Sequence, residues 1–549
     1  MNDDRQPIDY NIALALEGAA APRTAKAALV MGRDGTYRSW TFGELRENTV
    51  SYAAALGEAG VRQGQRVMLM VRPSMEFVCL TFALFRLGAT VILIDPGMGY
   101  RNLLRCVGRV RPDSLVAIPL VHLLSRIFPR PFSTVRNRVC VGRPFPGSGP
   151  SLRSLEARAP RGETTRFAAG RDDLAAIIFT TGSTGPPKGV RYTHGIFHAQ
   201  LRLIREYYRI GPGEVDQPCF PLFALFSTAL GARAVIPEMN PAKPARVNPR
   251  LFVRSILDQG VTYSFGSPAI WEVVSSYCLE HDIVLPVRKI LMAGAPVSGA
   301  LIERVSRIMD PRGEIHTPYG ATECLPVASV SGREILAGTW DRTRQGGGVC
   351  VGRPLPGIDI RIIRPEDGPI RSWQEAGELP AGEIGEIVVK GPVVTGAYDH
   401  DDRETMLAKI RDGGDFWHRM GDMGYLDDQG RLWFCGRKAH RVRTEQGVMY
   451  TIPCEAIFNE HPEVLRSALV GVGKEGAQRP VLIVELAEGK KRTDRLVAEL
   501  RALAATYDLT SSIETFLVHP SFPVDIRHNA KIFRERLALW AGDQLQEQG

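Results

Sequence analysis

Apolar residues near the N-terminus alternate between helical and strand-like spacing. Thr41 and Glu44 have the spacing of a capping box, which predicts that a helix begins after Thr41 and continues to about Leu56. The apolar segments 66–71 and 89–94 predict buried strands, and the apolar residues of 74–87 predict a helix between them. Strand, helix and strand at this spacing predict a βαβ unit and therefore a parallel sheet.

The same alternation continues to about residue 320. It predicts a helix over 250–260 and strands at 175–179, 262–265 and 289–292. Residues 314–317 predict a short strand that ends at a turn formed by Tyr319 and Gly320.

The pattern changes after about Gly352. Short strands between glycine and proline turns predict a β-rich region over 358–363, 384–390 and 431–434, and a small α+β unit follows Arg437. The predicted class is α/β. We expect residues 1–437 to form a large domain of parallel-sheet subdomains with a β-rich subdomain. Residues 438–549 are expected to form a small mobile α+β domain.

Composition excludes several classes of protein. About 44% of the 549 residues are hydrophobic and 23% are charged, as in ordinary globular proteins. The apolar run 77–85 is far shorter than the roughly 18 residues that span a bilayer, so we expect no transmembrane segment. The polar, acidic N-terminus predicts no secretory signal. Nine scattered cysteines without a CxxC motif predict reduced thiols in a cytoplasmic enzyme, with neither disulfides nor a zinc site.

Positive charge is concentrated in one segment. The formal net charge is +8, yet residues 101–166 alone contain thirteen arginines and no lysine against Asp113, Glu156 and Glu163. Three phenylalanines are the segment's only aromatic residues, which is few for a surface that stacks on bases. The segment therefore predicts an arginine-rich surface for an acidic partner, and we expect no nucleic-acid binding.

The segment 179–190, FTTGSTGPPKGV, carries the clearest chemistry. A strand leads into a loop that is rich in glycine and hydroxyl groups and contains Lys188. Glycine allows backbone N–H groups to approach an anion, hydroxyls add donors, and the lysine adds a positive charge, so the loop predicts a polyphosphate site. It lacks the spacing of a Walker A motif, which disfavours a P-loop NTPase.

This loop resembles the phosphate-binding signature of the adenylate-forming superfamily, which includes acyl-CoA synthetases, luciferases and adenylation domains of nonribosomal peptide synthetases. Further resemblances to superfamily motifs follow in the same order, at 293–296 (AGAP), 319–323 (YGATE), 382–387 (GEIGEI), 420–422 (MGD), 436–437 (GR) and 523–534 (PVDIRHNAKIFR). The resemblance covers roughly residues 35 to 540.

The resemblance implies binding of ATP with Mg²⁺ and a role for each matching residue. The loop would hold the β- and γ-phosphates through Thr180, Thr181, Gly182, Ser183, Thr184, Gly185 and Lys188. The adenine side would comprise Ala293, Gly294, Ala295, Pro296, Tyr319 and Gly320. Thr322 would contact the α-phosphate, Glu323 would hold Mg²⁺, Asp422 would bind the ribose beside Arg437, and Lys531 would bridge the substrate carboxylate and the α-phosphate. A carboxylate that attacks an anionic phosphate needs such cations in the transition state.

The segment 220–227, FPLFALFS, lies at the superfamily's substrate-binding position. The resemblance implies that Phe220, Phe223, Phe226 and Ser227 contact the substrate, and the alternative is that the phenylalanines are ordinary core residues. The segment contains no acid, so an amino acid's ammonium group would be unpaired there, and an acyl chain fits better.

Departures from the common motifs concern the acceptor. Many acyl-CoA synthetases have PLFH where this chain has PLFA, an Asp or Lys at the hinge where it has Ala439, and Gly-Lys where it has Ala530-Lys531. The strings PLFALF, GRKAHRV and RHNAKIFR resemble the β-lactone synthetases of bacterial long-chain olefin biosynthesis.

That resemblance implies activation of a long-chain β-hydroxy acid as acyl-AMP. The substrate's own hydroxyl would then attack to close a β-lactone and release AMP. His194, His440 or the AMP phosphate could take the hydroxyl proton. Other enzymes of olefin biosynthesis are the expected partners. Two alternatives stay open: a fatty acyl-CoA synthetase, and a non-catalytic scaffold that recruits a partner through residues 101–166.

Overall fold

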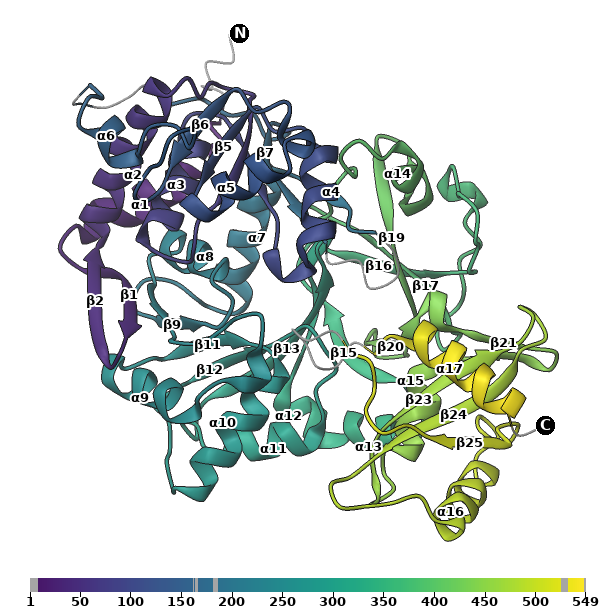
Figure 1. The fold of residues 1–549 in the computed structure, drawn as a ribbon. Coiled ribbons are helices and arrows are strands. Elements are labelled where there is room, and N and C mark those ends of the chain that lie inside the picture. Colours follow the sequence, from purple (N-terminus) through teal and green to yellow (C-terminus); the bar gives the residue numbers. More distant parts are fainter. Residues whose placement is uncertain (1–7, 161, 163–165, 181–185, 525–531, 548–549) are drawn as a thin grey trace, which may run out of the picture.

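A computed structural model describes residues 8–160, 162, 166–180, 186–524 and 532–547 (Figure 1). Two large sheets and the helices around them form the chain up to Arg437, and a small sheet with its helices forms the C-terminal part. The predicted α/β class is confirmed.

The first sheet has six strands, of which only the last pair is antiparallel. Their order is β6 (Asn137–Cys140), β5 (Ser114–Ala117), β3 (Arg66–Met70), β4 (Thr90–Leu93), β7 (Leu174–Phe179) and β8 (Gly189–Thr193). β3, α3 (Met75–Arg86) and β4 form the βαβ unit that the sequence predicts. The helix α2 (Phe42–Glu58) begins at the predicted capping box, where the Thr41 hydroxyl accepts a hydrogen bond from the Glu44 N–H.

Helices cover both faces of this sheet because successive strand residues point to opposite sides. Val67 and Leu69 of β3 pack with α2 and α3, whereas Met68 packs with α4 (Tyr100–Val110) and α5 (Pro119–Ile127). α2, α3, α7 (His194–Tyr207) and α8 (Phe223–Ala229) share one core with residues of both large sheets. These helices therefore join the two sheets into one body.

The second large sheet combines a parallel part with an antiparallel part. β10 (Arg233–Ile236), β9 (Val215–Pro218), β11 (Tyr263–Gly266), β12 (Lys289–Met292) and β13 (Glu314–Ala321) run parallel. At the end next to β10 lie β1 (Ala27–Arg33) and the edge strand β2 (Thr36–Thr41). α9 (Pro249–Gln259), α10 (Pro268–Glu280) and α11 (Gly299–Arg307) pack on the outer face.

The antiparallel part is the predicted β-rich region. Its strands are β14 (Cys324–Ser331), β15 (Val349–Pro354), β16 (Asp359–Ile363), β17 (Gly385–Lys390), β18 (Lys409–Asp412), β19 (Asp415–Leu426) and β20 (Leu432–Arg437). The sequence prediction for β13 was wrong at its end: the strand does not stop before Tyr319 but continues to Ala321. Tyr319 pairs with Ala328 of β14, the next strand in the chain, and this pairing extends β13 through the glycine.

The C-terminal part contains a separate three-stranded sheet. Its strands are β23 (Val464–Val472), β24 (Arg479–Leu486) and β25 (Thr515–Val518), and its helices are α15 (Thr451–Phe458), α16 (Asp494–Ala505) and α17 (Arg534–Glu547). The hairpin of β21 (Val442–Thr444) and β22 (Gly447–Met449) precedes it. All nine cysteines of the chain are buried as free thiols. Within the described residues, no helix is both long and apolar enough to cross a membrane.

Candidate nucleotide-binding site

A cavity of about 1020 Å³ lies where the carboxyl ends of β12 and β13 meet the β-rich region and the C-terminal part. Ligands of open parallel sheets bind at this edge. The cavity brings together residues from five of the matched motifs: Thr180, Lys188, Gly294, Ala295, Pro296, Tyr319, Gly320, Thr322, Glu323, Asp422 and Arg437. Residues 181–185 of the predicted loop lie outside the described residues.

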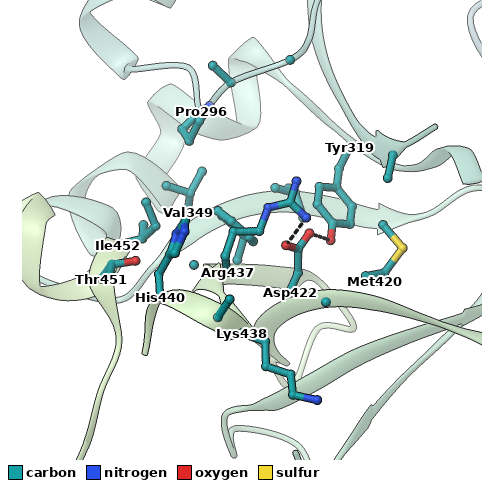
Figure 2. A pocket seen from close by; sticks show the side chains of 18 of the residues that line it. Pro296, Tyr319, Val349, Met420, Asp422, Arg437, Lys438, His440, Thr451 and Ile452 are labelled. Carbon is teal, nitrogen blue, oxygen red and sulfur yellow. Dashed lines mark hydrogen bonds and ion pairs between the residues drawn. The ribbon is translucent and has the colours of Figure 1, made fainter. Parts of the chain in front are cut away.

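Asp422 is held between Tyr319 and Arg437 (Figure 2). The Tyr319 hydroxyl donates to Asp422 Oδ2 at 2.6 Å, and Arg437 Nη1 lies 2.9 Å from Asp422 Oδ1. Asp422 and Arg437 are cross-strand partners on β19 and β20, so the pairing is built into the sheet. Burial, together with the Asp422 carboxylate, raises the pKa of Tyr319 well above its usual value and keeps the phenol a donor. The group presents a fixed carboxylate, an acceptor suited to hydroxyl groups such as those of a ribose.

The ends of the phosphate loop are fastened to each other. The Thr180 N–H donates to the Lys188 carbonyl at 2.9 Å, and the Lys188 N–H donates to the Thr180 hydroxyl at 3.2 Å. The Lys188 ammonium forms an ion pair with Glu404 of α14 (Asp402–Ala408) and lies 5.1 Å from the centre of the Tyr398 ring. The two ends of the loop are therefore adjacent, and the Lys188 ammonium group lies beside the cavity.

Glu323 lies in the turn between β13 and β14, and its carboxylate faces the cavity. Its Oε1 accepts from the Tyr398 hydroxyl at 2.7 Å, and its carbonyl accepts from Thr395 N–H and Oγ1, both at 2.9 Å. Burial and the Glu323 charge raise the pKa of Tyr398. The Tyr192 hydroxyl of β8 donates to the Thr322 carbonyl, which ties the turn to the strand that follows the loop. One oriented carboxylate beside a phosphate site fits Mg²⁺, which takes one or two protein carboxylates together with phosphate oxygens.

Ion pairs of two carboxylates with four basic residues lie at the connection to the C-terminal part. Lys438 Nζ lies 3.0 Å from Glu386 Oε2, and Arg419 Nη2 lies 2.7 Å from the same oxygen. Asp367 pairs with Arg441 at 3.3 Å and with Arg443 at 2.8 Å. In Figure 2 the Lys438 side chain points away from Asp422. These ion pairs hold residues 438–443 against the β-rich region.

The two histidines considered as bases are placed differently. His440 lines the cavity, with Nε2 at 3.0 Å from Glu535 Oε1. His194 is buried at the start of α7, where its Nδ1 accepts from the Ile12 N–H at 3.1 Å and its ring packs on Phe85. Burial lowers the pKa of His194 to about 4. His194 does not line the cavity, and its contacts are those of a core residue.

The predicted catalytic residue Lys531 lies outside the described residues. Two later residues of the same motif, Ile532 and Arg534, line the cavity. Arg534 pairs with the buried Glu455 of α15 at 2.6 Å. The C-terminal motif thus reaches the cavity through its described part.

The expected substrate residues form a separate cluster. Phe223 stacks on Phe265 with ring centres 4.0 Å apart and contacts Phe226 at 5.9 Å and Phe220 at 6.5 Å. These rings are half-buried and lie near the carboxyl ends of β9 and β11. Neither they nor Ser227 and Ala293 line the nucleotide cavity.

Asp216 of β9 is a buried acid that sequence reasoning missed. The hydroxyl of the buried Ser227 donates to its Oδ2. Burial raises the pKa of Asp216 well above its usual value, so the carboxyl is a poor counter-ion for an ammonium group. Tyr398, Glu404 and Lys409 were also missed because no motif marks them. Lys409 donates to the Thr395 carbonyl, and burial lowers its pKa to about 8.

Comparisons with known proteins show the family of the chain. The family model described as "AMP-binding enzyme" matches residues 16–399. An olefin β-lactone synthetase of Stenotrophomonas maltophilia (strain K279a) is 45% identical over 510 residues, which are 92% of this chain and 91% of the relative. An olefin β-lactone synthetase of Xanthomonas campestris pv. campestris is 44% identical over 512 residues, again 92% and 91% of the two chains.

Solved structures share the fold. The amide bond synthetase McbA of Marinactinospora thermotolerans has a TM-score of 0.80 at 22% identity and covers 97% of this chain and 100% of its own. ATP-bound MatB of Rhodopseudomonas palustris has a TM-score of 0.77 at 21% identity and covers 98% and 99%. The family match over most of the chain, together with the first two relatives, leads to one conclusion: the chain belongs to the family of AMP-binding enzymes and is an ATP-dependent, adenylate-forming enzyme.

Proposed function

We propose that this enzyme converts a long-chain β-hydroxy acid and ATP into a β-lactone, AMP and pyrophosphate, as a step of olefin biosynthesis in the cytoplasm. The observation that carries the proposal is the 45% identity, over 92% of the chain, to a protein named olefin β-lactone synthetase. The gathering of the ATP-site motifs around one cavity supports it.

In the first step the substrate carboxylate attacks the α-phosphorus of ATP. An oxygen–phosphorus bond forms, the bond to the β-phosphate oxygen breaks, and pyrophosphate leaves. Lys188 and the loop 180–188 hold the departing phosphates, and Asp422 holds the ribose. Glu323 would hold Mg²⁺, which supplies positive charge to the phosphates when bound. Lys531 offsets the negative charge that the carboxylate and the α-phosphate share in the transition state.

In the second step the β-hydroxyl oxygen attacks the acyl carbonyl carbon. A carbon–oxygen bond closes the four-membered ring, and the bond to AMP breaks. Because the nucleophile is tethered, no external acceptor is needed. The hydroxyl proton goes to the AMP phosphate or to His440, which lines the cavity. His194 is not the base in this proposal because its Nδ1 is occupied by the Ile12 N–H.

The proposal also assigns a binding site to the acyl chain and divides the enzyme into two domains. Phe220, Phe223 and Phe226, with Ser227 beneath them, form the wall for the acyl chain beside the nucleotide cavity. Residues 1–437 form the large domain, and residues 438–549 form the domain that carries Lys531.

The test is an assay with a long-chain β-hydroxy acid, ATP and Mg²⁺, with and without CoA, in which products are identified by mass. We expect a β-lactone and AMP at equal rates in both mixtures. A 3-deoxy acid, which lacks the nucleophile, should give no lactone. A CoA thioester formed from the 3-deoxy acid as fast as the β-hydroxy acid releases AMP would support a fatty acyl-CoA synthetase instead. No AMP in any mixture would support a non-catalytic scaffold.

A further inference from the structure

The helix α5 exposes large apolar side chains to solvent. Leu120, Leu123 and Ile127 are 66%, 47% and 61% exposed, and Phe128 at the end of the helix is 38% exposed. The spacing of the three aliphatic residues places them on one face of the helix. The described residues include fourteen exposed large hydrophobic side chains, and four of them lie in this single nine-residue stretch. Isolated exposed apolar residues are normal, but a cluster marks an interaction surface.

The opposite face of α5 is already packed. Val121 is buried in the core on this side of the six-stranded sheet, and Leu124 packs against that core. Ser125 and His122 are also buried, and the His122 ring lies 3.1 Å from the Val139 carbonyl. The fold therefore does not require the outer leucines and Ile127. A helix that is apolar on both faces normally has an apolar partner on each.

Exposed arginines lie on α5 and on the neighbouring segments. The short helix Arg130–Phe132 follows α5 and packs on α4, where Gly108 faces Pro131. Arg126 donates to the Pro146 carbonyl at 2.7 Å, which brings the loop containing Arg143 beside α5. The exposed arginines of α4, of α5 and of the segments that follow α5 include Arg101, Arg105, Arg126, Arg130 and Arg143. Within the described part of the chain, the ion pairs of neighbouring arginines are made by Arg66, Arg109 and Arg166 and not by any of these five.

Figure 1 shows α4 and α5 on the same side of the six-stranded sheet, on the outside of the molecule. We define the α5 patch as Leu120, Leu123, Ile127 and Phe128 with the five arginines named above.

We propose that this patch docks the enzyme on an anionic lipid bilayer. An apolar stripe with exposed arginines on neighbouring segments matches the interface of such a bilayer, where the aliphatic side chains enter the acyl boundary and the guanidinium groups meet the phosphates. The net positive charge of residues 101–166 adds a longer-range attraction to anionic lipid. A protein partner would have to supply both an apolar face and a dense set of anionic groups, whereas an anionic bilayer supplies acyl chains and phosphates over its whole surface.

The proposal is tested by sedimentation with vesicles. One set contains phosphatidylcholine alone and the other also contains phosphatidylglycerol. We expect the full-length protein to pellet with the anionic vesicles and to be released as salt screens the arginines. The triple variant Leu120→Ser, Leu123→Ser, Ile127→Ser and the double variant Arg105→Glu, Arg130→Glu should each bind at least about tenfold more weakly.

Matched controls separate this patch from surface polarity in general. The triple variant Leu257→Ser, Val284→Ser, Leu465→Ser changes three exposed apolar residues elsewhere, and Arg250→Glu with Arg333→Glu changes two exposed arginines elsewhere. Both controls should bind as the unmodified protein does, and the melting temperature of every variant reports its folding. Equal binding of the α5 triple variant and its control would overturn the proposal. Failure of the unmodified protein to bind anionic vesicles would also overturn it and would favour a protein partner for the patch.

Discussion

Lys188 of the phosphate loop forms an ion pair with Glu404, which is 216 positions later in the chain. Lys188 also lies against the ring of Tyr398, whose hydroxyl donates to Glu323. In the proposed complex with ATP, a phosphate and the Glu404 carboxylate compete for the same ammonium group. Binding of ATP must therefore displace or weaken this pair.

Glu404→Gln should tighten ATP binding. The half-exposed pair is worth about 1 kcal/mol, so we expect the KM for ATP to fall by up to roughly fivefold with little change in kcat. Lys188→Met should instead raise the KM for ATP in ATP–pyrophosphate exchange. A higher KM in Glu404→Gln would show that Glu404 assists ATP binding.

Asp422→Asn should remove the fixed carboxylate between Tyr319 and Arg437. The amide is a weaker acceptor for ribose hydroxyls and leaves Arg437 without its charge partner, so exchange should fall by about 10²-fold. Tyr319→Phe is the matched variant, since it removes one hydrogen bond and keeps the carboxylate, and its loss should be smaller. Equal losses in the two variants would assign the effect to orientation of the carboxylate rather than to its charge.

Lys531→Ala should abolish adenylation while ATP still binds. Loss of a charge-assisted contact made mainly in the transition state typically costs on the order of 10²- to 10³-fold in rate. ATP–pyrophosphate exchange measures the first step, and equilibrium dialysis measures ATP binding. Exchange within about threefold of the unmodified enzyme would refute the assigned role.

His194 should make stability depend on pH below neutrality. Its pKa is about 4 in the folded protein, mainly through burial, against 6.5 ordinarily, while Asp173 and Asp9 oppose the shift and His198 adds to it. The unfolded chain therefore binds the proton first, and stability is lost as the pH falls from 6.5 toward 4, by on the order of 3 kcal/mol.

The variant His194→Asn removes this titration, so its unfolding free energy should change less over that pH range than that of the unmodified protein. Denaturant unfolding at several pH values measures the difference. The control is the variant His281→Asn, which changes an exposed histidine. Its unfolding free energy should depend on pH as strongly as that of the unmodified protein. If the unfolding free energy of His194→Asn depends on pH as strongly as that of the unmodified protein, His194 is not the cause of the pH dependence.

Phe223→Ala should shift substrate preference toward longer or bulkier acyl chains. The ring stacks on Phe265, so its removal opens space beside the proposed chain, and each methylene buried there contributes about 0.8 kcal/mol. Rates with a series of β-hydroxy acids give the chain-length profile. The control is the variant Arg136→Gln, which changes an exposed arginine and should leave the chain-length profile unchanged. A changed profile in Arg136→Gln and an unchanged one in Phe223→Ala would place the acyl chain elsewhere.

Local features of the chain were predictable from sequence. Short-range sequence patterns predicted the capping box at Thr41, the first βαβ unit and the class of each major region. The structure contains these elements close to their predicted positions. The matched motifs also identified eleven of the residues that line the cavity. Such motifs are readable because a phosphate site needs particular residue types at neighbouring positions.

Contacts between residues that no shared motif links were decided only by the tertiary structure. The pairs Lys188–Glu404, Glu323–Tyr398 and Ser227–Asp216 join residues that no motif links, and β13 continues past Thr317 because β14 supplies its hydrogen-bond partners. The sequence determined which residue types and local elements are present. The interaction partner of each side chain depends on how the sheets pack. Burial and distance determine how strong each ion pair and hydrogen bond is, and a single segment of sequence fixes neither its burial nor its distance from other segments.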